Sequence, residues 1–251
     1  MSERFAAKVI VVTGATSGMG RAVAERVASE GAKVVLAARG KESGEELAEL
    51  LPDAIFVPTD VTVEADVASL VHQAVQKYGR IDGVFNNVGA ATAMGPLPTV
   101  SDEDWNAELS LNLSSVFYGL KHEIPALVAS GGGAIVNNAS NLGVVGAAGM
   151  AAYSAAKHGV VGLTRSAALE HAASGIRVNA LVTGGVDTPL LRRNMSGVSP
   201  EEAIRFAGGM HPVGRIAAPQ EIAAFVAFLL SDDATFITGA ALAIDGGLTA
   251  A

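Results

Sequence analysis

The stretch Lys8-Val-Ile-Val-Val-Thr-Gly-Ala-Thr-Ser-Gly-Met-Gly20, followed by Arg21 to Glu30, decides the fold of this chain. Lys8 to Val12 is a β-branched run that predicts a buried strand, and the glycines after it predict a tight turn. The apolar residues of Arg21 to Glu30 recur at helical spacing. A strand, a glycine loop and a helix in this order favour a dinucleotide site, because glycines let the backbone approach a pyrophosphate at the helix N-terminus. The spacing Gly-x-x-x-Gly-x-Gly alone would also suit an ordinary turn.

Strand and helix patterns alternate along the rest of the chain. This alternation predicts a single α/β domain over residues 1–251, with a Rossmann-type doubly wound, mainly parallel seven-stranded sheet and helices on both faces. Ligands are expected at the C-terminal ends of the strands. The expected strands are Lys8–Val12, Lys33–Ala37, Ala54–Val57, Ile81–Phe85, Ala134–Asn138, Ile176–Val182 and Ala241–Ile244. Helices are expected at Arg21–Glu30, at Glu64–Tyr78, from Ser101 or Asp102 through Leu120, at the segment that carries Tyr153 and Lys157, and from Pro219.

The composition excludes several classes of function. Half of the 251 residues are hydrophobic and 17% are charged, which excludes a disordered chain. The net charge of −8 comes without a basic run, which argues against nucleic-acid or anionic-membrane binding. There is no cysteine, so disulfides and thiolate catalysis are excluded, and the histidines lack metal-ligand spacing. With no signal peptide or membrane span in the sequence, we expect a soluble cytoplasmic protein without a metal.

Tyr153 and Lys157 stand four residues apart in an alanine-rich, helix-compatible segment. At this spacing both side chains lie on one helix face, so the ammonium can approach the phenol. A neighbouring positive charge lowers the pKa of a tyrosine from its usual ~10, and the pair could then act as an acid/base catalyst. A surface Tyr beside a surface Lys would show the same spacing. Asn112 sits among apolar neighbours in a predicted helix, either as a packing feature or in a hydrogen-bond network.

The end of the second strand bears on the choice of nucleotide. Dinucleotide folds that bind NAD place an acidic side chain here, but Ala38 and Arg39 occupy these positions. The guanidinium of Arg39 can pair with a 2′-phosphate, and Lys41 can assist. The sequence therefore favours NADP(H), and NAD(H) is the alternative. Arg39 could also be a solvated residue at a strand end that binds no nucleotide.

Taken together and in order, these markers closely resemble the short-chain dehydrogenase/reductase family, in its branch of about 250 residues. The resemblance runs from about Lys8 to Gly247. Its markers are TGATSGMG at Thr13–Gly20, Asp60-Val61, NNVG at Asn86–Gly89, Asn112, Ser140 at the end of the fifth strand, Tyr153-x-x-x-Lys157, and the turn that ends in Thr188.

The resemblance implies a catalytic tetrad of Asn112, Ser140, Tyr153 and Lys157. Tyr153 would exchange the proton, Ser140 would hold the substrate oxygen, Lys157 would bind the nicotinamide ribose and favour the phenolate, and Asn112 would hold a water. The resemblance further implies that the nucleotide is bound by Gly14, Thr16, Ser17, Gly18, Met19, Gly20, Arg39, Asp60, Val61, Asn87, Gly89, Tyr153, Lys157, Gly184, Val186 and Thr188.

Two positions depart from the family pattern. The usual Pro-Gly after the sixth strand is Thr183-Gly184, and the loss of proline predicts a looser loop. Val88 replaces the alanine of NNAG and adds methyl groups near the nucleotide. Neither change removes a reacting group.

The function implied is an NADP(H)-dependent oxidoreductase, a carbonyl reductase or alcohol dehydrogenase, that interconverts a ketone and a secondary alcohol. Leu190 to Pro212 is predicted to be irregular, either as a lid over the substrate or as a plain surface loop. The apolar residues of this segment and of the loop after Ser140 favour a small apolar ketone or ring alcohol. They are Leu142, Val144, Val145, Met150, Leu190, Leu191, Met195 and Met210.

Three other functions stay open. One is a 3-oxoacyl-carrier-protein reductase, for which Arg192 and Arg193 could form a docking patch. Another is an NAD-dependent alcohol or diol dehydrogenase. The third is a non-catalytic dinucleotide sensor, which would often have lost Tyr, Lys or Ser. The resemblance also implies a homotetramer that packs through helices at Trp105–Leu127 and Tyr153–His171.

Overall fold

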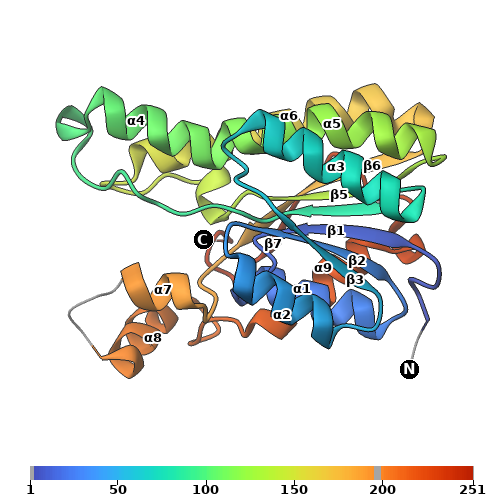
Figure 1. The fold of residues 1–251 in the computed structure, drawn as a ribbon. Coiled ribbons are helices and arrows are strands. Elements are labelled where there is room, and N and C mark those ends of the chain that lie inside the picture. Colours follow the sequence, from blue (N-terminus) through green and yellow to red (C-terminus); the bar gives the residue numbers. More distant parts are fainter. Residues whose placement is uncertain (1–2, 195–198, 251) are drawn as a thin grey trace.

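The computed structural model describes residues 3–194 and 199–250, and its strands form one seven-stranded sheet. The strands are β1 (Val9–Thr13), β2 (Lys33–Ala38), β3 (Ala54–Pro58), β4 (Gly83–Asn86), β5 (Gly133–Asn138), β6 (Ile176–Thr183) and β7 (Ala241–Ile244). Their order is β3-β2-β1-β4-β5-β6-β7, and every neighbouring pair is parallel (Figure 1). The predicted Rossmann-type sheet is therefore confirmed.

Helices cover both faces of this sheet (Figure 1). They are α1 (Gly18–Ser29), α2 (Lys41–Leu50), α3 (Glu64–Tyr78), α4 (Asp102–Leu109), α5 (Ser115–Ala129), α6 (Ala151–His171), α7 (Pro189–Asn194), α8 (Pro200–Gly209) and α9 (Pro219–Leu230). Helices α1, α2 and α9 pack on one face, and α3, α5 and α6 pack on the other. None of the described helices has the length and apolar character needed to cross a membrane.

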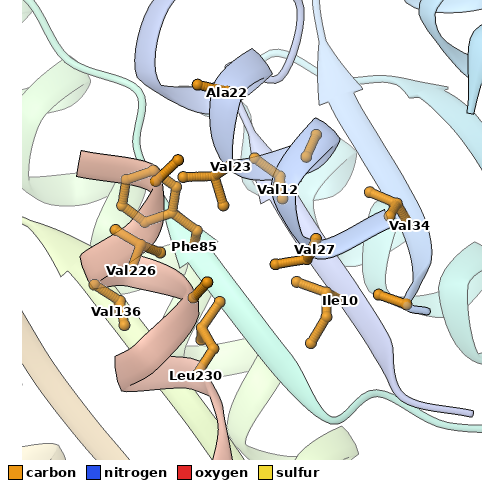
Figure 2. Close-up of a cluster of buried hydrophobic side chains, with 14 of the residues drawn as sticks. Ile10, Val12, Ala22, Val23, Val27, Val34, Phe85, Val136, Val226 and Leu230 are labelled. Carbon is orange, nitrogen blue, oxygen red and sulfur yellow. The ribbon is translucent and has the colours of Figure 1, made fainter. Parts of the chain in front are cut away.

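Each face of the sheet has its own hydrophobic core. Figure 2 shows the core under α1 and α9, where Val23 and Val27 of α1 and Val226 and Leu230 of α9 surround Phe85 of β4. All five of these side chains are buried. Burial on both faces explains why the strands are continuous apolar runs rather than alternating ones.

The strand order reverses between β1 and β4, and this switch opens a crevice at their C-terminal ends. The chain leaves β1 through Gly14, whose φ of +62° suits glycine. A Cβ on Gly14 would lie 2.9 Å from Nδ2 of Asn87 and 3.2 Å from Cγ2 of Val88, so the two loops touch. Asn87 also donates through Nδ2 to the carbonyl of Thr13 at 3.0 Å. The fold therefore brings the glycine loop and the Asn86–Gly89 segment together.

The long helix predicted from Ser101 is interrupted in the structure. Ser101 caps α4 as expected, because its Oγ accepts from the backbone N–H of Asp104 at 3.0 Å. The residues Ser110–Ser114 then form a π-helical turn before α5 begins. Such turns are frequent at functional sites, and this one contains Asn112.

The described parts of the segment Leu190–Pro212 are largely helical, so the prediction of irregular structure was wrong. Ser199 and Glu202 form a capping box in which Ser199 Oγ accepts from Glu202 N at 3.2 Å and Glu202 Oε2 accepts from Ser199 N at 2.9 Å. Together with Pro200 at the first helical position, this box begins α8. Helices α7 and α8 lie together beside one end of the sheet (Figure 1). The residues 195–198, with Met195, lie outside the described part of the chain.

Glu123 of α5 is buried next to the sheet, at 1% exposure. Its Oε2 accepts from Asn86 Nδ2 at 2.9 Å, and Asn86 also donates to Asn137 of β5 at 3.1 Å. Burial raises the pKa of Glu123 from its ordinary 4.5 to about 7, and the hydrogen bond from Asn86 partly opposes this rise. The folded protein therefore favours the neutral carboxyl.

Replacement of Glu123 by Gln is expected to stabilise the protein at alkaline pH. A carboxyl whose pKa is raised on folding stabilises the fold below its unfolded pKa, and this stabilisation is lost as pH rises through about 7. Gln stays neutral, so Glu123→Gln should increase the free energy of unfolding by about 3 kcal/mol at pH 8.5 and by little at pH 4.5. Urea unfolding at both pH values measures this difference, and an equal effect at the two pH values would contradict the assignment.

Candidate active site

Tyr153 and Lys157 lie in the first two turns of α6, facing the end of β5. Lys157 is only 1% exposed, and its Nζ donates to the carbonyl of Asn138 at 2.8 Å. The same ammonium lies 5.6 Å from the centre of the Tyr153 ring. Lys157 is buried, so Tyr153 and Lys157 are not the pair of surface residues that the same spacing would also allow.

Ser140 lies in the loop that follows β5, in a strained backbone conformation. Its φ of +63° is rare for a residue with a side chain and is typical of functional sites. Its hydroxyl donates to Oδ1 of Asn141 at 3.0 Å and accepts from the backbone N–H of Leu142 at 3.4 Å. The Ser140 hydroxyl also lies close enough to Tyr153 to lower the pKa of its phenol. The structure thus brings the two hydroxyls together.

Asn112 is fully buried in the π-helical turn and belongs to a hydrogen-bond network. Its Oδ1 accepts from the backbone N–H of Ala90 at 3.1 Å, and its Nδ2 donates to the Ala90 carbonyl at 2.8 Å. Gly89 joins this network to Lys157, since a Cβ there would lie 2.8 Å from Asn112 Oδ1 and 2.9 Å from Lys157 Nζ. All four predicted catalytic residues therefore meet at the C-terminal ends of β4 and β5.

Glu108 was not predicted from the sequence, and it is fully buried one turn before Asn112. Its Oε1 accepts from Asn112 Nδ2 at 2.8 Å. Its Oε2 accepts from the backbone N–H and the hydroxyl of Thr92 and from the N–H of Ala93, at 2.6 to 2.7 Å. Only the spacing of four residues from Asn112 could have signalled this role, and an isolated Glu in a helix normally faces solvent.

The titration of the catalytic pair differs from the expectation that Lys157 lowers the pKa of Tyr153. Burial raises the pKa of Tyr153 to about 12, the hydrogen bond with Ser140 lowers it, and the charge of Glu108 raises it. Burial lowers the pKa of Lys157 to about 8, while the charge of Glu108 acts in the opposite direction. Burial has the largest effect on the phenol, so the pKa of Tyr153 is raised where the sequence predicted a lowered one. The Tyr153 phenol is therefore protonated at neutral pH.

The six predicted residues of the glycine loop lie in the turn after β1 and in the first turn of α1. Gly18 has a φ of +53°, and a Cβ on it would lie 2.9 Å from Cγ2 of Thr188. Ser17 is the N-cap residue of α1, and its side chain caps no backbone N–H in the part of the chain that the structure describes. The side chain of Met19 packs against the hydrophobic core. The remaining three are Gly14, Thr16 and Gly20.

Arg39, Asp60 and Val61 follow β2 and β3 at the same edge of the sheet. Arg39 is exposed and Val61 is buried. Hydrogen bonds from Thr62 lower the pKa of the Asp60 carboxyl, and the charge of Arg39 contributes to this lowering. Arg39 and Asp60 are therefore close enough for their charges to interact.

His211 holds the loop after β6, which contains Gly184, Val186 and Thr188, and sequence reasoning missed it. Its Nε2 accepts from the backbone N–H of Gly185 at 2.8 Å, and Nδ1 lies 2.8 Å from the carbonyl of Ala207 in α8. Nδ1 must then carry the proton, because Nε2 acts as the acceptor. This histidine ties α8 to the loop in which Thr183-Gly184 replaces the usual Pro-Gly. The extra methyl groups of Val88 lie beside the glycine loop, because a Cβ on Gly14 would lie 3.2 Å from Val88 Cγ2.

No group of three metal-ligating side chains occurs within residues 3–194 and 199–250. Proton-exchanging, oxygen-holding and charged groups instead meet beside a glycine loop at the switch point of a parallel sheet. This arrangement suits an acid/base reaction on an oxygen of a substrate next to a bound dinucleotide.

Known proteins that match this chain over nearly its whole length support an acid/base site of this kind. A family model described as enoyl-(acyl carrier protein) reductase matches residues 14–249. The cis-4-hydroxycyclohexanecarboxylate dehydrogenase of Sinomonas cyclohexanicum is 44% identical over 254 aligned positions, which cover all of both chains. The cyclohexanol dehydrogenase of Acinetobacter sp. (strain SE19) is 39% identical, over 99% of this chain and 98% of that one. A crystal structure of levodione reductase matches with a TM-score of 0.93 and 38% identity, over 98% of this chain and 99% of the other.

The conclusion from the model match, the full-length relatives and the assembled site is that this chain belongs to the short-chain dehydrogenase/reductase family, as an oxidoreductase that acts on CH–OH groups with NAD(P).

Proposed function

We propose that the protein is an NADP(H)-dependent dehydrogenase/reductase that interconverts an alicyclic secondary alcohol and its ketone. The observation that carries this proposal is the hydroxyl pair of Tyr153 and Ser140 beside the buried ammonium of Lys157. These groups can hold a substrate oxygen and exchange a proton with it. A bound nicotinamide dinucleotide would supply or accept the hydride.

Tyr153 is the general acid in ketone reduction and the general base in alcohol oxidation. Its raised pKa keeps the phenol protonated at neutral pH, which is the form that reduction needs. Oxidation needs the phenolate, which the N-terminal end of α6 and the ammonium of Lys157 stabilise. Ser140 donates a hydrogen bond to the substrate oxygen, and Asn112 holds the Ala90 loop next to Lys157. We therefore propose catalytic roles for Ser140, Tyr153 and Lys157, and a positioning role for Asn112.

The glycine loop fits the pyrophosphate of a dinucleotide. The positive φ angles of Gly14 and Gly18 suit glycine, and the uncapped start of α1 leaves N–H donors for an anion. We propose that Asn87, Gly89 and Lys157 hold the nicotinamide ribose. Gly184, Val186 and Thr188 would lie beside the nicotinamide, and Asp60 and Val61 beside the adenine.

Arg39 supports a preference for NADP(H). It is exposed at the end of β2, where the ribose of the adenosine half would lie, and the same position carries no acidic side chain. Lys41 begins α2 next to it and lies 3.8 Å from Glu45. Arg39 is therefore the better candidate for a 2′-phosphate.

Arg39→Ala is expected to weaken NADPH binding by about 10-fold to 100-fold and to leave NADH binding unchanged, because a charge-assisted pair with phosphate is lost. Titration of both nucleotides by nicotinamide fluorescence measures this effect. Arg26→Ala is the control, since Arg26 pairs with Glu30 near the other end of α1. Equal NADPH affinity in the wild type and Arg39→Ala would make Arg39 a bystander and favour NAD(H).

Exposed apolar side chains support a ring-shaped, apolar substrate. Val144 and Val145 follow Ser140, and Met94 lies in the loop that is joined to the same region by Gly95 N donating to Gly149 O at 2.9 Å. Both dehydrogenase relatives are named for secondary alcohols on a six-membered ring. We propose that α7 and α8 close this site as a lid.

The carrier-protein alternative finds less support. Arg192, one of two arginines considered for a docking patch, pairs with Asp187 at 2.9 Å. A comparison of kcat/KM for cyclohexanol oxidation and for reduction of an acetoacetyl-carrier-protein thioester tests the substrate class. We expect turnover of cyclohexanol, and exclusive turnover of the thioester would overturn the ring-alcohol proposal.

The homotetramer implied by the family resemblance is also a proposal. Phe117 and Val128 of α5 are each 47% exposed and Leu169 of α6 is 85% exposed, so both helices carry apolar surface that a neighbouring subunit could cover. Light scattering should give the mass of four chains, and the mass of one chain would contradict this assembly.

A further inference from the structure

Glu108 is a buried acid that the reaction described above does not use. Its side chain has 0% exposure, yet four donors point at its two carboxylate oxygens. An ionised carboxylate accepts hydrogen bonds only, so this set of donors stabilises the charged form. The site therefore contains a buried negative charge.

Lys157 is a buried positive charge in the same region. It is 1% exposed, and its Nζ donates to the neutral carbonyl of Asn138. Among the residues that the structure describes, it forms no direct ion pair with a carboxylate. A buried charge is costly unless an opposite charge or strong hydrogen bonds compensate for it.

The amide of Asn112 lies between the two charges. Its Nδ2 donates to Glu108 Oε1 at 2.8 Å, which fixes the orientation of the amide. A Cβ placed on Gly89 would lie 2.8 Å from Asn112 Oδ1 and 2.9 Å from Lys157 Nζ, so both atoms lie beside Gly89. Glu108 is thus one amide group away from the catalytic lysine.

We propose that Glu108 is a positioning residue and the buried counter-charge of Lys157, that it acts through Asn112, and that it sets the pH range in which the enzyme oxidises alcohols. The proposal rests on the proposed acid/base roles of Tyr153 and Lys157. It does not depend on which ring alcohol is the substrate.

The direction of the pH effect follows from the groups around the pair. Tyr153 and Lys157 are faced by the Ser140 hydroxyl and the Asn138 carbonyl from the end of β5, by the Asn112 amide, and by the charge of Glu108 from α4. The negative charge raises the pKa of Tyr153 and the pKa of Lys157 alike. Its removal should lower both, and because oxidation needs the Tyr153 phenolate, the rise of activity with pH should move to lower pH.

The first test is the pH dependence of kcat/KM for cyclohexanol oxidation in Glu108→Gln. The rise of activity with pH should move to lower pH by about one unit, the size of effect expected from one nearby buried charge. Glu108→Asp keeps the charge but shortens the side chain, so its profile should stay at the wild-type pH while the rate falls. Glu123→Gln is the matched control, because Glu123 is as buried as Glu108 but bonds Asn86 instead, and it should leave the profile unchanged.

A uniform loss of rate in Glu108→Gln, with the profile at its wild-type position, would show that Glu108 is only structural. If Glu108→Gln does not fold, a profile of Glu108→Asp that is shifted despite the retained charge would overturn the proposal in the same way.

A second measurement needs no substrate and separates this proposal from the proposed function. In protein labelled with ¹³Cε-lysine, the NMR signal of Lys157, assigned by its loss in Lys157→Arg, should titrate near pH 8 in the wild type. It should titrate about one unit lower in Glu108→Gln. This shift without cyclohexanol turnover would leave the role of Glu108 intact while the substrate assignment fails, and an unchanged titration would overturn the role of Glu108.

Discussion

Tyr153→Phe is expected to lower kcat for alcohol oxidation by about 1,000-fold, because a positioned general acid/base contributes 10²-fold to 10⁴-fold. The phenyl ring still fills the same space, and only the hydroxyl whose pKa Ser140 lowers is lost. NADPH binding should therefore stay within about threefold of the wild type, since a lost proton-transfer group affects the transition state more than the bound nucleotide. Steady-state kinetics and a fluorescence titration of the same preparation measure both quantities.

Tyr78→Phe is the matched control for this substitution. The Tyr78 hydroxyl bonds Asp53 at 3.0 Å, next to β3 and outside the assembled site. Its loss should leave kcat unchanged. If wild type and Tyr153→Phe both bind nucleotide and neither turns over any ring alcohol or ketone, the protein is a dinucleotide sensor and the enzyme assignment fails.

Lys157→Met is expected to impair both catalysis and nucleotide binding. Met has a similar length but no charge, so the phenolate of Tyr153 and the nicotinamide ribose both lose a partner. We expect kcat/KM to fall by about 100-fold to 1,000-fold, corresponding to about 3 to 4 kcal/mol of transition-state stabilisation, and the Kd for NADPH to rise.

The effect of Lys157→Met on stability distinguishes this lysine from an exposed one. Glu108 would be left as a buried charge without its counter-charge, so the Tm should fall as well. Lys33→Met is the control, because Lys33 is partly exposed at the start of β2 and lies over the Tyr78 ring. A Lys157→Met protein with wild-type NADPH affinity and kcat/KM would contradict the role given to Lys157.

Much of the fold was predictable because its signals are local. A buried strand, glycines at positions of positive φ and a helix start follow one another around the Thr13–Gly20 loop. Each of these features is determined by residues that are consecutive in the sequence. The seven strands were predicted because a parallel sheet that is buried on both faces needs continuous apolar runs. The four residues of the tetrad were predicted through the family resemblance, and the structure brings them together.

The features that were missed depend on contacts between distant residues. Glu108 is held by the backbone of Thr92 and Ala93, which lie 16 and 15 residues earlier in the chain, and its spacing from Asn112 is the one local signal. His211 reaches back 26 residues to Gly185. The raised pKa of Tyr153 reflects burial by the whole fold, whereas the sequence shows only the adjacent lysine.

The helix α8 could have been predicted, because the sequence contains the residues that begin a helix. Ser199-Pro200-Glu201-Glu202 is a capping box with proline at the first helical position. The glycines and prolines nearby suggested irregular structure instead. Gly208 and Gly209 in fact end this helix rather than prevent it.

The most direct test of the central claim is isotope transfer from a ring alcohol. Purified protein is incubated with NADP⁺ and cyclohexanol that carries deuterium at C1, in parallel with cis-4-hydroxycyclohexanecarboxylate labelled at C4. We predict that deuterium appears on the nicotinamide ring together with the corresponding ketone, and that Tyr153→Phe loses this transfer. Protein that binds NADP⁺ but transfers no deuterium from either alcohol would contradict the account.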